Sequence, residues 1–192
     1  MKKMLILLCA TSLLQPLFAQ QATVTETVET VKTYPFSDPD PVADPSDLFY
    51  PYFRFDGFSA KGTDRQWKVV SLENDYIKLT LFPEIGGKIW GKEFIYNNHV
   101  VKFRDIAMRG PWTSGGIEFN FGIIGHAPTS STPVDYVTRQ KPDGSVSCYV
   151  SSYELVTRTL WTVEVNLPKD KAYFTTTTTW HNSSSIDQPY YQ

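Results

Sequence analysis

The sequence has 192 residues, 41% of them hydrophobic and 15% aromatic, with 18 Lys and Arg against 20 Asp and Glu. This length suits one domain with a core of its own. The charges are nearly balanced and scattered, which excludes the basic patch typical of nucleic-acid binding, so we expect no nucleic-acid partner. The abundance of Thr, Val, Tyr and Phe favours an all-β fold.

The first segment, residues 1–19, has a basic start at Lys2-Lys3, an apolar run and the small residue Ala19 at its end. This pattern predicts a cleaved signal peptide, so we expect an exported protein, periplasmic or extracellular. The apolar run is shorter than the roughly 20 residues of a spanning helix, and we expect no membrane span after cleavage. An uncleaved anchor is the alternative.

Removing this leader leaves Cys148 as the remaining cysteine, so we expect no internal disulfide. Cys148 alternates with Val146 and Val150. That alternation predicts a buried structural thiol rather than a nucleophile.

The next segment, residues 20–47, is rich in Thr and then in Pro and Asp, ending in SDPDPVADP. Each proline removes a backbone donor and favours extended geometry before it, which predicts an extended arm. The aromatic run at residues 48–58 is too apolar to stay in solvent, and we expect it to lie along a sheet as a strap. A sugar-stacking platform is the alternative. The sandwich domain itself is expected over residues 48–192.

From Trp67 onward the sequence alternates apolar and polar residues between turn-forming clusters. We predict three hairpins from these patterns, with strands at residues 67–72 and 76–82, 133–139 and 145–153, and 159–166 and 172–180. In the last hairpin, Trp161, Val163 and Val165 are expected on one face. No amphipathic helix of ten residues is evident, so the pattern predicts an antiparallel β-sandwich.

The central stretch, residues 109–133, reads RGPWTSGGIEFNFGIIGHAPTSSTP and follows no repeating period. Glycines and prolines break it on both sides of a short predicted strand at residues 117–121. Alternation there places Ile117, Phe119 and Phe121 on one face and Glu118 with Asn120 on the other. An acid and an amide on one strand face are suited to contact a ligand, so we expect the functional site here.

The order of motifs YPYFRFDGF, LFPEIGGKIWG, RGPWTSGGIEFNF and WHNSSSIDQPYYQ resembles secreted bacterial proteins with a domain of unknown function of galactose-mutarotase-like supersandwich type. The resemblance covers nearly the whole mature chain, and RGPWTSGGIEFNF is its most specific part. It implies a carbohydrate partner, a poly- or oligosaccharide. It also implies a longer domain, so we expect the chain to be an amino-terminal fragment, with the sandwich incomplete at Gln192.

With a sugar as ligand, the central residues suggest acid–base chemistry. Glu118 is predicted to be desolvated among aromatic neighbours, with a raised pKa, and to act as general acid with His126 as its partner. Arg109 and Asn120 would bind sugar groups, and Trp112 or Trp90 would stack on a pyranose. In the structural alternative, Arg109 only holds the carboxylate of Glu118 or Asp105.

Metal ligands show no short spacing that predicts a site. The available residues are far apart: Glu118, His126, Asp135, His99 and His181. We therefore predict no metal and no cofactor. A calcium ion held by loop carbonyls and carboxylates would leave no such pattern, so the sequence leaves calcium open.

Two classes of function fit these observations. The first is a glycan-active enzyme of glycoside-hydrolase or sugar-epimerase type, with Glu118 and His126 as catalytic residues. The second is a non-catalytic glycan-binding or protein-interaction module of a larger exported protein. The sequence alone does not decide between catalysis and binding.

Overall fold

A computed structural model describes residues 21–37, 56–94, 99–102, 104–110, 112–121, 126–155 and 157–188. In these ranges the chain forms ten strands and two short 3₁₀ turns, η1 (Pro83–Ile85) and η3 (Pro128–Ser130), with no α-helix. The described residues also form no helix that is long and apolar enough to cross a bilayer. The predicted signal peptide, the Pro- and Asp-rich part of the predicted arm (residues 38–47) and most of the predicted aromatic strap lie outside the described ranges. The last four residues of the motif WHNSSSIDQPYYQ lie outside them as well.

The first sheet has the strand order β5-β4-β3-β2-β1-β6. All its neighbours are antiparallel except β1 and β6, which pair in parallel. The hairpin of β2 and β3 confirms the first predicted strand pair. The bounds are β1 (Thr23–Tyr34), β2 (Thr63–Glu73), β3 (Ile77–Phe82), β4 (Lys88–Phe94), β5 (His99–Lys102) and β6 (Ile106–Ala107).

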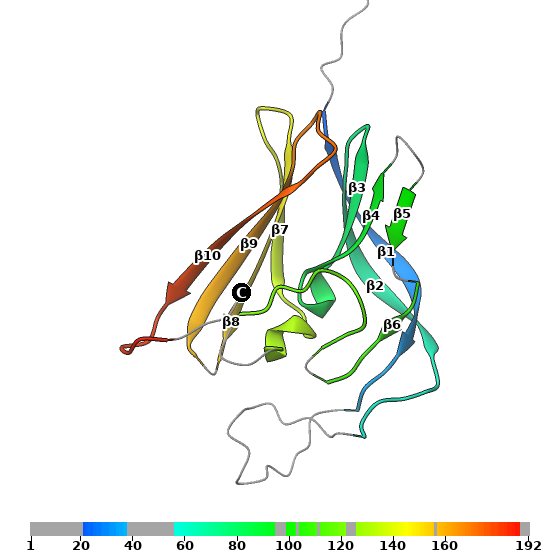
Figure 1. The fold of residues 1–192 in the computed structure, drawn as a ribbon, viewed down its shortest axis with the longest axis vertical. Coiled ribbons are helices and arrows are strands. Elements are labelled where there is room, and N and C mark those ends of the chain that lie inside the picture. Colours follow the sequence, from blue (N-terminus) through cyan, green and yellow to red (C-terminus); the bar gives the residue numbers. More distant parts are fainter. Residues whose placement is uncertain are drawn as a thin grey trace, which may run out of the picture.

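The second sheet has the order β10-β9-β8-β7, and all its neighbours are antiparallel. Its strands are β7 (Asp135–Gln140), β8 (Val146–Glu154), β9 (Thr159–Leu167) and β10 (Thr175–Asn182). The hairpins of β7 with β8 and of β9 with β10 confirm the other two predicted pairs. Figure 1 shows this sheet on one side of the molecule and the six-stranded sheet on the other. The predicted all-β sandwich is therefore confirmed.

The main core lies between the two sheets. Its members come from β2, β3 and β4 on one side and from β8 and β9 on the other. Trp161, Val163 and Val165 share the inner face of β9, as predicted, and Cys148 is buried on β8 beside them. Burying each large apolar side chain contributes roughly 1.5–3 kcal/mol, so this layer supplies the largest favourable contribution to folding.

A second core covers the other face of the six-stranded sheet. It contains Val31, Trp67, Val69, Phe82, Ile85, Trp90 and Ile106. Neighbouring residues of β2 therefore enter different cores: Val69 lies in the second core and Val70 in the main core. The part of the six-stranded sheet formed by β2, β3 and β4 is buried on both faces, which the simple alternation of a one-sided sheet does not predict.

The predicted arm requires a correction. Residues 23–34 within it form β1, which pairs with β2 from Thr23 opposite Glu73 to Thr33 opposite Thr63. Polar residues dominate this strand, and the first half is mostly exposed. It is extended, as expected, but it belongs to the sandwich, so the domain begins well before residue 48.

Candidate functional site

The loop between β6 and β7 carries the candidate residues and is bonded to β4. Ile117 and Ile89 form an isolated antiparallel bridge, with Ile117 N donating to the Ile89 carbonyl at 2.9 Å. Gly116 approaches β4 so closely that a Cβ there would lie 3.3 Å from the Ile89 carbonyl oxygen. Its φ of +81° also favours glycine. This close approach places Glu118 beside the first residue of β4.

The strand predicted at residues 117–121 is wrong, because only Ile117 makes a bridge there. Phe119 and Phe121 do enter the main core, at 7% and 1% exposure, but Ile117 is 45% exposed. The two phenylalanines anchor the segment to the core, and Phe121 stacks on Trp161 with ring centres 5.1 Å apart. Glu118 thus comes from an anchored loop rather than from a sheet.

Three side chains form a continuous series of contacts from β4 to the surface. Lys88 Nζ donates to Glu118 Oε2 at 2.9 Å and to Thr113 Oγ1 at 2.6 Å. The other carboxylate oxygen, Oε1, lies 2.7 Å from His126 Nδ1. Side-chain exposure rises in steps, from 0% for Lys88 to 17% for Glu118 and 51% for His126. We call this series the Lys88–Glu118–His126 chain.

Electrostatics link the buried end of this series to its middle. Burial lowers the pKa of Lys88 from its ordinary value, and the hydrogen bond and charge of Glu118 partly offset that effect. The apolar surroundings expected for Glu118 are not observed, because both of its oxygens have polar partners. The carboxylate is therefore held in one orientation between an ammonium and an imidazole.

Trp112 lies beside the exposed end of the series. Its ring centre is 5.9 Å from that of His126, with an angle of 31° between the planes. Trp112 is 38% exposed. The sequence prediction that placed Trp112, Glu118 and His126 in one site agrees with this arrangement, although their functional roles stay predictions.

Asn120 and Arg109 have structural contacts of their own. Asn120 Oδ1 accepts a hydrogen bond from Ala127 N at 2.7 Å, which ties the two ends of the loop segment together next to His126. Arg109 donates from Nη1 to the Met108 carbonyl at 2.8 Å, and its guanidinium carbon lies 5.1 Å from the ring centre of Phe58. The basic partner of Glu118 is thus Lys88, not Arg109.

Trp90 has to be removed from the predicted binding residues. It is 1% exposed and lies in the second core, with its ring 5.6 Å from that of Phe82. A ring covered on both faces has no surface on which a sugar could stack. The error arises because β4 lies in the part of the six-stranded sheet that is buried on both faces.

Sequence reasoning missed Lys88 and Thr113. The available signal was a lysine inside an apolar run, between Ile85 and Ile89 in EIGGKIWG. A lysine buried among such residues requires a carboxylate partner. That partner is 30 residues away in the sequence, so spacing alone does not identify it.

No three His, Cys, Asp or Glu residues come together as a metal-binding group in the part of the chain that the structure describes. In the Lys88–Glu118–His126 chain, the lysine ammonium occupies the position beside Glu118 Oε2 that a cation would take. The three side chains of this series offer an ammonium, a carboxylate and an imidazole, groups that form charge-assisted hydrogen bonds.

The described residues form a two-sheet β-sandwich, and the loop between β6 and β7 carries the partly exposed Lys88–Glu118–His126 chain. Residues 44–192 match the family described as "Domain of unknown function (DUF5107)", and the chain belongs to this family.

A solved structure has a similar fold: a TPR-domain containing protein from Parabacteroides distasonis ATCC 8503. The TM-score is 0.68 at 19% sequence identity, which shows likeness of fold alone. The match covers 83% of this chain and 29% of that protein, so this chain spans less than a third of its length.

Proposed function

We propose that this chain is an exported, carbohydrate-handling domain of galactose-mutarotase-like architecture, in which His126 and Glu118 support proton transfer on a bound sugar. The observation that carries the proposal is the Lys88–Glu118–His126 chain, which runs from a buried ammonium to a half-exposed imidazole. A carboxylate bonded to one ring nitrogen orients a histidine for acid–base work through the other nitrogen.

The roles of the two catalytic candidates differ from those expected from the sequence. Because Glu118 engages His126 Nδ1, the Nε2 atom is the ring nitrogen left to exchange a proton with a ligand. Glu118 has both oxygens occupied and acts as the positioning residue rather than as the general acid. Proton transfer by a histidine placed in this way contributes roughly 10²–10⁴-fold to a rate.

Trp112 supports a sugar as the ligand. The apolar face of a pyranose stacks on an aromatic ring while its hydroxyls stay available for hydrogen bonds. The indole of Trp112 is partly exposed and lies next to His126, so a ring stacked there would bring its polar edge near Nε2. The backbone around Arg109 supports the position of this indole, since Arg109 N donates to the Trp112 carbonyl at 2.9 Å.

The reaction class that fits best is a proton transfer of the epimerase or mutarotase kind. Opening a sugar ring needs one proton donor and one acceptor near the ring oxygen and the anomeric hydroxyl. Glycoside hydrolysis generally needs two carboxyl groups about 5–9.5 Å apart across the bond. The Lys88–Glu118–His126 chain supplies one carboxylate, and both of its oxygens are occupied, which disfavours the second reaction. For ring opening, His126 Nε2 takes one of the two proton-transfer roles, and a solvent water beside this half-exposed ring takes the other.

A non-catalytic module is the second candidate function. The solved protein of similar fold is described as containing TPR domains, and this chain matches only part of it. That supports a domain that binds a glycan or a protein within a larger protein. Such a module would bind its ligand over Trp112 without turnover.

A matched pair of variants in the full chain tests the proposal against a panel of aldoses and oligosaccharides. Glu118→Gln is expected to lower kcat by about 100-fold or more with KM changed little, since it removes charge but keeps shape. Glu73→Gln is the control, because Glu73 is a surface residue paired with Lys78. Turnover unaffected by Glu118→Gln would contradict the proposal. Binding that is lost in Trp112→Ala, without turnover in the parent, would support the module instead.

A further inference from the structure

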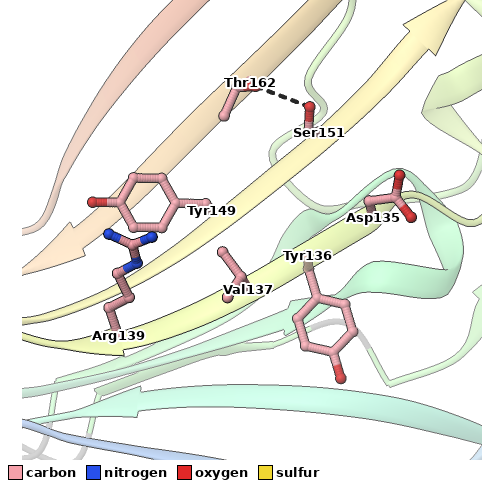
Figure 2. Close-up of a pocket in the computed structure, with 7 residues that line it drawn as sticks. All are labelled: Asp135, Tyr136, Val137, Arg139, Tyr149, Ser151 and Thr162. Carbon is pink, nitrogen blue, oxygen red and sulfur yellow. Dashed lines mark hydrogen bonds between the residues drawn. The ribbon is translucent and has the colours of Figure 1, made fainter.

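The outer face of the four-stranded sheet carries a hollow of about 390 Å³ that none of the residues of the candidate functional site lines. Its volume lies within the range of roughly 300–1,000 Å³ typical of small-molecule sites. Figure 2 shows its lining, which comes from β7, β8 and β9 and includes Asp135, Val137, Arg139, Tyr149, Ser151 and Thr162.

Strand register explains why these residues share one surface. Asp135 lies opposite Ser151, and Val137 lies opposite Tyr149. The residues of β8 that alternate with them, Cys148 and Val150, are fully buried in the main core. The hollow therefore opens on the face of the sheet that is turned away from the six-stranded sheet.

The hollow is separate from the candidate site. The loop that carries Glu118 reaches this sheet from the inner face, where Phe121 stacks on Trp161. Tyr136, at the edge of the hollow, points away from its neighbours Val137 and Arg139 (Figure 2), and its hydroxyl donates to Glu26 Oε2 at 2.8 Å. Tyr136 thus braces β7 against β1 rather than facing a ligand.

Tyr149 and Arg139 contact each other along one side of the hollow. The Tyr149 hydroxyl donates to Glu164 Oε1 at 2.9 Å, and Lys141 and Ser147 bind the same oxygen. The guanidinium carbon of Arg139 lies 5.6 Å from the Tyr149 ring centre, and the two groups lie together in Figure 2. Ion pairs between the described residues do not include Arg139. Arg139 therefore lies against the Tyr149 ring without an ion-pair partner among the described residues, so its guanidinium is available to an acidic ligand.

We propose that this hollow binds an acidic sugar, such as a uronic acid, at a site distinct from the catalytic candidates. Arg139 matches a carboxylate with two parallel N–H donors. Val137, 49% exposed, offers an apolar surface for the sugar ring. Asp135 and the hydrogen-bonded hydroxyls of Ser151 and Thr162, 2.9 Å apart, offer partners for sugar hydroxyls.

This site does not depend on turnover at His126, so the two proposals fail independently. A titration of the full chain followed by amide chemical shifts separates them by position: the hollow maps to β7, β8 and β9, and the other site maps to residues 109–131. The probes are galacturonate, neutral galactose and acetate. We expect galacturonate to shift β7–β9 amides with at least tenfold higher affinity than either galactose or acetate.

Arg139→Gln is expected to weaken galacturonate binding at least tenfold, since it removes the charge that meets the carboxylate. Arg104→Gln is the matched control, because Arg104 is 92% exposed and precedes β6 of the other sheet. Asp135→Ala is a second variant and is expected to weaken galacturonate but not acetate. Equal affinity of Arg139→Gln and the parent chain, equal affinity for acetate and galacturonate, or shifts confined to residues 109–131 would each overturn the proposal.

Discussion

Two lysine–glutamate pairs in different parts of this molecule differ in burial and in their other partners. We call Lys88–Glu118 the loop pair and Lys141–Glu164 the sheet pair. In the loop, Lys88 is fully buried and Glu118 uses its second oxygen to hold a half-exposed histidine. On the outer face of the four-stranded sheet, Lys141 is 32% exposed. One oxygen of Glu164 accepts hydrogen bonds from Lys141, Ser147 and Tyr149.

The difference shows what separates a structural ion pair from a candidate site. The Glu164 group ends in donors that all point back at the same carboxylate, so it fixes side chains. The Glu118 group runs from a fully buried lysine to a half-exposed imidazole, so under the proposed function it links the interior to the side chain that meets the ligand. The predictions that follow test this contrast, beginning with the largest expected effect.

Replacing the lysine should lower the free energy of unfolding far more in the loop pair than in the sheet pair. Lys88→Met leaves Glu118 without its buried partner and is expected to lower the free energy of unfolding by about 3 kcal/mol. Lys141→Met should cost at most about 1 kcal/mol, because that pair is partly exposed and screened by solvent. Urea unfolding of both variants gives the comparison, and Lys88→Met/Glu118→Leu should recover part of the loss. Equal losses in the two single variants would remove the distinction.

The loop pair should also depend on one backbone position. Gly116→Ala adds a Cβ 3.3 Å from the Ile89 carbonyl oxygen at a φ of +81°, and is expected to cost about 1–2 kcal/mol. It should also move Glu118 away from Lys88 and reduce any turnover. Thermal unfolding and kinetics measure the two effects. A stable variant with unchanged kinetics would show that the loop tolerates displacement.

The sheet pair should respond to pH. Partial burial alone would raise the pKa of Glu164, but hydrogen bonds from Lys141, Ser147 and Tyr149 outweigh it and the pKa is lowered. The hydrogen bond to Glu164 raises the pKa of Lys141. The stabilisation is therefore present above the unfolded pKa of Glu164, about 4.3, and is lost as pH falls through the lowered folded value.

At the alkaline end, the contribution of Lys141 is present below its unfolded pKa of about 10.4 and is lost as pH rises through the raised folded value. Glu164→Gln should thus cost about 1 kcal/mol at pH 7, after screening, and less below pH 4. Urea midpoints of parent and variant between pH 3 and 7 test this. A gap that stays constant with pH would contradict the assigned ion pair.

The smallest effect on stability is expected for His126, at the exposed end of the Lys88–Glu118–His126 chain. His126→Gln changes a half-exposed side chain, so the free energy of unfolding should change by about 0.5 kcal/mol or less. Turnover should nevertheless fall as far as in Glu118→Gln, because the two residues work as one unit. A large loss of stability would place His126 among the structural residues.

Much of the fold could be predicted because hairpins are local. Alternation and turn residues such as Lys141-Pro142-Asp143-Gly144 specify neighbouring strands, and all three predicted hairpins are present. Strand β1 was missed because its pairing with β2 spans a long connection and its residues are mostly polar. Its parallel contact with β6 is longer-range still.

The site could be predicted only in part, for related reasons. Glu118 and His126 stand eight residues apart, so their chemistry was visible within one stretch of sequence. Lys88 contributes from another strand, and its role appears only when Gly116 brings the loop against β4. Trp90 was assigned to the surface because alternation does not reveal that a sheet is covered on both sides.

The buried thiol of Cys148 can be used as a chemical probe of how often the two sheets separate. The Cys148 side chain lies between the sheets and is fully buried. Burial raises the pKa of its thiol to about 12, so the thiol is unreactive while the sheets stay packed. An alkylating reagent can reach it only during excursions in which β8 separates from the core. The rate of alkylation, compared with that of a free thiol, therefore reports the population of separated states under native conditions, without denaturant.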